Sequence, residues 1–138
     1  MKRAFVLHGS GLDEAAVHGE TLCAELTDAG EIRRRVFTPA DFGVRTKYTV
    51  EDMRGGSPQE NAAITLDILS GGGSPAHSDF LAANLALIFL ASRKAQSLEE
   101  AIVMARKALR DGAGLRVIEA HRAFAKRNAR DAQMLKSA

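Results

Sequence analysis

The periodicity of the sequence changes once, at Gly55 and Gly56, and this change limits the folds that the chain can adopt. Before it, residues 3–8, 21–26 and 31–38 are short β-type runs separated by loop residues. After it, apolar residues recur at helical spacing behind helix-start signals. Strands first and helices second indicate α+β packing or the tail end of an α/β domain.

The β-type runs predict a small sheet. Asp28 and Gly30 lie between the second and third runs, which favours a hairpin with a loop of about four residues. The long basic side chains of the third run are typical of an edge strand. Parallel strands need a crossover connection, so only residues 3–8 suit a parallel core sheet. We therefore expect a short mixed sheet, with the natural neighbours of the first strand outside this sequence.

Serine caps predict the helices. Ser57 and Ser97 each have a glutamate three residues later, as in a capping box, and Ser74 is followed by proline. The second helix is apolar nearly all round over residues 80–91, so we expect it to be buried. A last helix is expected from about Leu115, which makes about four helices in all.

Length and composition fit one domain. A chain of 138 residues with 46% hydrophobic residues can bury a core without covalent staples. We predict a single partial domain over residues 1–138: β-rich over 1–43, helical over 57–125, and a basic tail over 126–138. The net charge of +2 gives no general attraction to nucleic acid or an anionic membrane. We interpret the basic tail as a solvated helix rather than a binding patch.

Cys23 is the only cysteine, so no internal disulfide can form, which is typical of a reducing compartment. Its place in an apolar run predicts a small buried hydrophobe. The apolar stretch near the N-terminus is too short for a signal-peptide core, and the longest apolar run is too short to span a bilayer. We expect a soluble, cytoplasmic protein.

The loop after the first run carries the candidate site. Asp13 and Glu14 offer two adjacent carboxylates, and Mg²⁺ prefers oxygen ligands. On spacing alone, a solvated turn is the favoured interpretation of this pair. Gly9 and Gly11 are weak candidates for letting a phosphate approach the backbone. His8, at the end of the run, is better explained as structural than as a base or ligand.

Two further features lie among the helices. Residues 71–73 are three glycines before Ser74, and a plain turn between helices explains them better than an anion-binding loop. Asn84 is a polar residue in an apolar helix. Because a buried amide must be paired, we predict that it satisfies a buried backbone group or caps a neighbouring element.

Several segments, in order, resemble those of anthranilate phosphoribosyltransferases. They are VLHGSGLDE (6–14), GET (19–21), AEL (24–26), EI (31–32), FTPADFG (37–43), GGSPQENA (55–62), NLA (84–86) and SLEEA (97–101). The resemblance implies the C-terminal part of the catalytic domain shared by nucleoside phosphorylases and phosphoribosyltransferases. It also implies transfer of phosphoribosyl from phosphoribosyl pyrophosphate to the amine of anthranilate, a step of tryptophan biosynthesis.

The resemblance assigns Asp13 and Glu14 to the acidic pair that binds Mg²⁺ near the pyrophosphate. The family's GTGGD pyrophosphate loop, its KHGN segment and its N-terminal helical domain have no counterpart here, so no catalytic residue is assigned. We expect the chain to be inactive alone, and to self-associate through an exposed sheet edge or apolar face. The alternatives are a split subunit that needs a partner, a non-catalytic interaction module, and a relative of the pyrimidine nucleoside phosphorylases.

Overall fold

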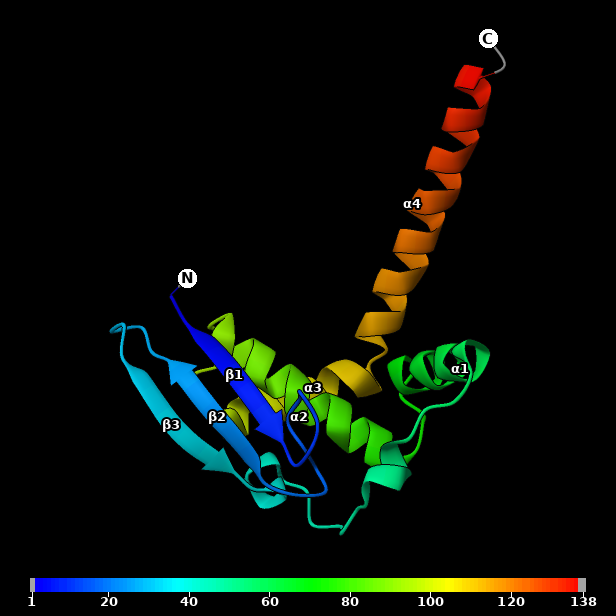
Figure 1. Ribbon diagram of the computed structural model, residues 1–138. Helices are drawn as coiled ribbons and strands as arrows, with labels where there is room; N and C mark the ends of the chain where they lie inside the picture. Colours follow the sequence, from blue (N-terminus) through cyan, green and yellow to red (C-terminus); the bar gives the residue numbers. More distant parts are fainter. Residues whose placement is uncertain (1, 137–138) are drawn as a thin grey trace.

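The computed structural model describes residues 2–136, with side chains described for residues 2–129. Its elements are β1 (Ala4–Gly9), β2 (Thr21–Leu26), β3 (Ile32–Phe37), two 3-10 turns (Pro39–Phe42 and Val50–Met53), α1 (Pro58–Leu69), α2 (Pro75–Ala91), α3 (Leu98–Arg110) and α4 (Ala113–Lys136). Three strands followed by four helices confirm the expected α/β class and the order of its elements (Figure 1).

The sheet has the strand order β1-β2-β3, and every pairing among the described strands is antiparallel. The expectation of a mixed sheet was therefore wrong for this part of the chain. The loop of residues 10–20 turns the chain back beside β1 without a crossover, and a parallel neighbour would need one. The hairpin of β2 and β3 is confirmed, and β3 is an edge strand as predicted.

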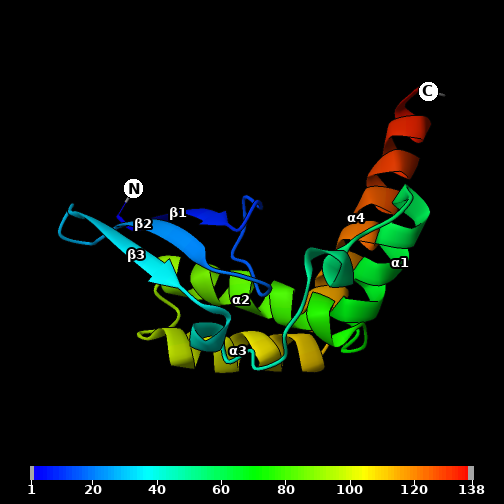
Figure 2. The ribbon, with the colours of Figure 1, turned by 60° about the horizontal axis from the view of Figure 1, so that its bottom comes forward.

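Helix α2 lies between the sheet and α3, so the chain forms three layers (Figure 2). Its buried side chains are Ala76, Ala82, Ala83, Ala86, Leu87 and Leu90. The sheet and α3 cover two flanks of the helix, which explains why α2 is apolar nearly all round. The expected burial is confirmed for most of residues 80–91, but Ile88 is 60% exposed. The alanines leave room for close approach of the neighbouring layers.

All three predicted serine caps are present. The Oγ atoms of Ser57, Ser74 and Ser97 each accept a hydrogen bond from the backbone N–H three residues on, at 3.3, 3.2 and 3.1 Å. The glycines after α1 form the expected interhelical turn. Gly71 has φ +91°, and the Gly72 N–H donates to the Asp67 carbonyl at 3.0 Å, as at a helix C-terminus.

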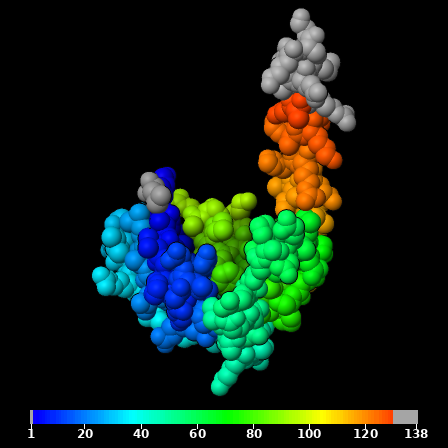
Figure 3. Space-filling view, turned by 45° about the vertical axis from the view of Figure 1, so that its right-hand side comes forward, coloured from blue at the N-terminus to red at the C-terminus, as the bar shows by residue number. Residues whose placement is uncertain are grey.

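Helix α4 leaves the body of the molecule (Figures 1 and 3). Its first turn packs against α1, because a Cβ on Gly114 would lie 2.6 Å from Leu69 Cδ2. Every described side chain from Glu119 to Ala129 is exposed. The helix continues unbroken through residues 126–136; Arg130 and Lys136 of the predicted basic tail lie outside the described side chains. Within residues 2–136, no helix is both long and apolar enough to cross a membrane.

Candidate metal site at the end of β1

A tight turn follows β1. The Gly9 N–H donates to the Leu12 carbonyl at 2.9 Å, and the Leu12 N–H donates to the Gly9 carbonyl at 3.1 Å. Ser10 and Gly11, at the two central positions, have φ +50° and +98°. Positive φ at both positions is the pattern of a type I′ turn. Asp13 therefore emerges directly after a fixed turn.

The two candidate glycines have different surroundings. A Cβ on Gly9 would lie 2.2 Å from the Glu14 carbonyl oxygen and 2.7 Å from the Ala16 nitrogen, so the loop backbone packs directly on Gly9. The Gly9 N–H is already paired within the turn, which gives this glycine a packing role. Gly11 lies exposed with open space around it, and its contact with a phosphate stays a prediction.

The residues after the acidic pair are buried and anchored. Asn84 Oδ1 accepts a hydrogen bond from the Ala15 N–H at 2.8 Å, and its Nδ2 donates to the Ala15 carbonyl at 3.0 Å. Thr21 Oγ1 accepts from the Ala16 N–H at 2.9 Å. Ala15 and Ala16 are fully buried. The prediction that Asn84 satisfies a buried backbone group is confirmed, and the loop lies over α2 (Figures 1 and 2).

Asp13 and Glu14 are exposed between these fixed points. Among the described residues, no group of three or more His, Cys, Asp or Glu side chains gathers as a metal cluster. Two carboxylates nevertheless fit Mg²⁺, which keeps several waters and is commonly held by one or two carboxylates together with substrate phosphates. The donor set therefore suits a cation that arrives with a phosphorylated ligand.

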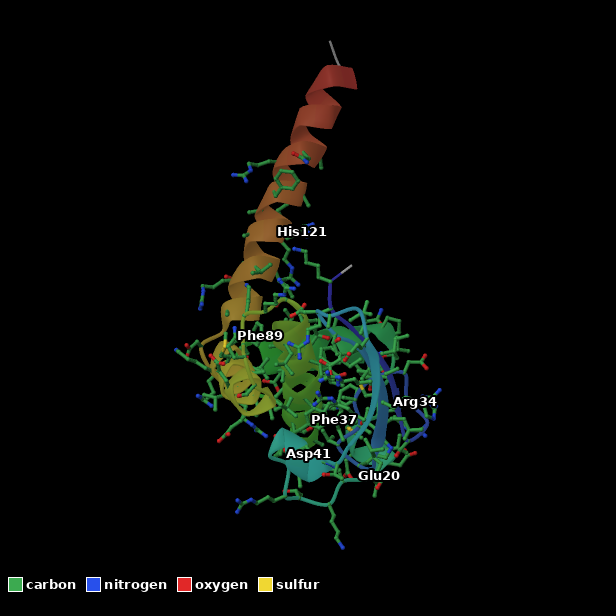
Figure 4. All side chains as sticks on the ribbon, turned by 90° about the vertical axis from the view of Figure 1, so that its left-hand side faces the viewer. Glu20, Arg34, Phe37, Asp41, Phe89 and His121 are labelled. Carbon is green, nitrogen blue, oxygen red and sulfur yellow. The ribbon has the colours of Figure 1, made fainter. Side chains whose placement is uncertain are left out.

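His8 does not join the acidic pair in a cluster. It is exposed in β1, opposite Leu22 of β2, which in turn pairs with Val36 of β3. These residues line a shallow hollow of about 440 Å³ on the outer face of the sheet. Figure 4 shows Arg34 on the same outer side, away from the helices, and Phe37 on the inner side.

The inner face of the sheet holds a charge that the sequence pattern did not reveal. Glu25 is 3% exposed and is paired with Arg3 Nη2 at 2.9 Å and with Arg35 Nε at 2.8 Å. Arg3 also donates to the Leu90 carbonyl at 3.3 Å, which ties the sheet to α2. Burial raises the pKa of the neighbouring Cys23 thiol, and the Glu25 carboxylate raises it further against the opposing effect of Arg35.

Residues 1–115 match the family described as "Glycosyl transferase family, a/b domain". The anthranilate phosphoribosyltransferase of Colwellia psychrerythraea is 47% identical over 115 residues, which are 83% of this chain and 31% of the relative. The enzyme of the same name from Aeromonas hydrophila is 50% identical over 101 residues, or 73% of this chain and 29% of the relative. The chain thus spans about a third of the length of the curated relatives it matches.

Solved structures of anthranilate phosphoribosyltransferases are also similar to this chain over about a third of their length. The anthranilate phosphoribosyltransferase of Thermus thermophilus superimposes with a TM-score of 0.79 at 33% identity, covering 88% of this chain and 35% of that one. The Saccharomyces cerevisiae enzyme, solved in complex with PRPP and Mg, superimposes with a TM-score of 0.72 at 26% identity, covering 83% of this chain and 33% of that one.

Proposed function

This chain belongs to the glycosyl transferase family, through its a/b domain, and from this premise we propose that it forms the cation-binding part of an anthranilate phosphoribosyltransferase. One observation carries the proposal. Asp13 and Glu14 are adjacent, exposed carboxylates on a loop whose backbone is fixed on both sides. The yeast relative whose structure contains PRPP and Mg supports Mg²⁺ as the cation.

In the proposed reaction, the amine of anthranilate attacks the ribose carbon of phosphoribosyl pyrophosphate. The bond from that carbon to the pyrophosphate oxygen breaks, pyrophosphate leaves with the electron pair, and the amine nitrogen releases one proton to solvent. Mg²⁺ held at this loop would supply neutralisation of the charge that develops on this leaving group. Asp13 and Glu14 would supply oxygen ligands to the cation, and the Gly9–Leu12 turn and the Ala15 anchor hold the backbone of this pair in place.

The substrates require more protein than these residues provide. The relatives are about three times as long as the part matched here. We therefore propose that further segments, in the same polypeptide or in a partner subunit, complete the binding of both substrates. On this account the 138 residues alone are inactive. A cytoplasmic location is part of the same proposal and is supported by a single buried free thiol at Cys23.

Self-association through the sheet is a further part of the proposal. Four large apolar side chains on the outer face are more than half exposed: Val6, Leu22, Ile32 and Val36. β1 and β3 are also unpaired along their outer edges within the described chain. A second copy of the chain, docked on the same face, would cover this surface symmetrically.

A chimera tests the proposed activity. Residues 1–115 of this chain replace the matching segment of the Colwellia psychrerythraea relative, and transfer is followed by loss of anthranilate fluorescence with PRPP and Mg²⁺. We expect Mg²⁺-dependent transfer in the chimera and at least about a tenfold loss with Asp13→Asn. Glu99→Gln, an exposed carboxylate in the first turn of α3, is the control and should leave the rate unchanged.

Two results would contradict the proposal. One is an active chimera whose Mg²⁺ dependence is the same with and without Asp13→Asn. The other is a folded chimera that binds both substrates and transfers nothing. A non-catalytic interaction module predicts the second result.

A further inference from the structure

We infer that Asn84, on α2, is a positioning residue for the Asp13–Glu14 pair. The inference rests on the proposed cation-binding role of that pair. The Asn84 side-chain amide lies in the middle of an apolar helix and fixes Ala15, which is 69 residues away in the sequence.

The amide of Asn84 is held in one orientation. Its Oδ1 accepts from the Ala15 N–H at 2.8 Å, and its Nδ2 donates to the Ala15 carbonyl at 3.0 Å. The second proton of Nδ2 goes to the Phe80 carbonyl, one turn back in α2, at 2.9 Å. A flipped amide would place its oxygen against two carbonyls and its NH₂ against an N–H, so only this orientation is satisfied.

The anchor acts next to the acidic pair. On one side, Leu12 is fixed by its two hydrogen bonds to Gly9. On the other side, Ala15 is fixed by Asn84, and Ala16 is fixed by buried Thr21. Asp13 and Glu14 are thus the two residues between the fixed points. Their carboxylates start from a preset backbone, which lowers the ordering cost of cation binding.

Asn61 provides a natural comparison within the same molecule. Its Oδ1 accepts from the Gly56 N–H at 2.8 Å, and its Nδ2 donates to the Gly56 carbonyl at 3.1 Å. This is the same two-point anchor on a loop that precedes α1 and does not carry the acidic pair. Asn61→Ala is therefore the matched control for Asn84→Ala.

The test uses Mn²⁺ as a paramagnetic probe, with inorganic pyrophosphate, on the whole 138-residue chain. Broadening of the backbone amide signals around Asp13 gives an apparent affinity. We expect Asn84→Ala to weaken this affinity about tenfold, the usual size for loss of a group that orients a metal ligand. Asn61→Ala should leave it unchanged. The Ala16 N–H is bonded to Thr21 and not to Asn84, so its hydrogen exchange reports on the loop as a whole. In the metal-free protein, this exchange should accelerate in Asn84→Ala and not in Asn61→Ala.

A second pair of variants covers the case in which Asn84→Ala does not fold. Thr21→Val removes the acceptor of the Ala16 N–H and leaves α2 untouched, whereas Thr21→Ser keeps that acceptor. Loss of affinity in the first variant and recovery in the second would support anchoring of this loop as the cause. Equal affinity in both variants would contradict it.

The outcomes separate the inference from the proposed function. If the parent binds Mn²⁺ and folded Asn84→Ala binds it equally well, the positioning role is wrong and the metal role stands. If neither the parent nor the chimera with the Colwellia psychrerythraea relative shows broadening around Asp13 with pyrophosphate, the metal role itself is wrong, and the positioning role falls with it.

Discussion

At the residue scale, Glu25 shows how a buried charge is accommodated in this sheet. It shares the inner face of β2 with Thr21 and Cys23, all of them buried. Alternation alone would place an apolar side chain there. The carboxylate is tolerated because Arg3 and Arg35 both reach it, and each keeps part of its side chain in solvent.

Removing this carboxylate should destabilise the fold. Glu25→Ala leaves two guanidinium groups without their partner and is expected to lower the free energy of unfolding by about 3 kcal/mol. Glu31→Ala removes an exposed carboxylate paired with Arg33 at 2.7 Å and should cost no more than about 1 kcal/mol. Urea unfolding of both variants measures the difference. Equal, small losses would show that Glu25 is dispensable.

At the element scale, the sequence predicted most of the secondary structure because the signals are local. The caps at Ser57, Ser74 and Ser97 mark the starts of three helices within a few residues of each signal. The hairpin of β2 and β3 follows from the turn residues between them. The direction of the β1 pairing was missed because it depends on the path of the loop over residues 10–20, which has no regular pattern.

The candidate site was predictable only in part, because local sequence signals do not encode contacts between distant residues. Adjacent carboxylates after a Gly-Ser-Gly turn are visible in the sequence, and so is a polar Asn84 in an apolar helix. Their connection is a contact between residues 69 apart, which no local pattern encodes. Thr21 was missed as an anchor because threonine is a common β-branched residue in strands, and nothing in the sequence shows that its hydroxyl accepts a hydrogen bond from the loop.

The capping box of α1 should make stability depend on pH. The pKa of Glu60 lies below its usual range because the Ser57 backbone N–H and side chain donate to its carboxylate. The pKa of Glu60 is lower in the folded state than in the unfolded state, where it is about 4.3, so the ionised carboxylate stabilises the fold at pH values above about 4.3. This stabilisation is lost as the pH falls through the folded-state pKa. Glu60→Gln should therefore reduce the loss of stability between about pH 5 and pH 3, measured by thermal unfolding. An unchanged pH dependence would contradict this role for Glu60.

At the scale of the whole molecule, one face of the sheet is packed and the other is open. The inner face lies on α2, whereas the outer face presents large apolar side chains around a shallow hollow. Exposed apolar surface of this kind promotes association. The edges of β1 and β3 add unpaired backbone groups to the same open sheet.

A charge on the outer face should keep the chain monomeric. Leu22 is 54% exposed in the central strand, and Leu22→Lys should abolish association in sedimentation velocity across a range of concentrations. Val103→Lys, at an equally apolar and 62% exposed site on α3, is the control and should behave like the parent. A parent chain that sediments as a monomer at every concentration would contradict the proposed self-association.

The most direct test of the cation-binding role is Mn²⁺ broadening in the Asp13→Asn/Glu14→Gln double variant, with pyrophosphate present. We expect broadening of amide signals around residues 12–16 in the parent and its loss in the double variant, with both spectra otherwise alike. Identical broadening in the two proteins would place the cation elsewhere and contradict the assignment of this loop.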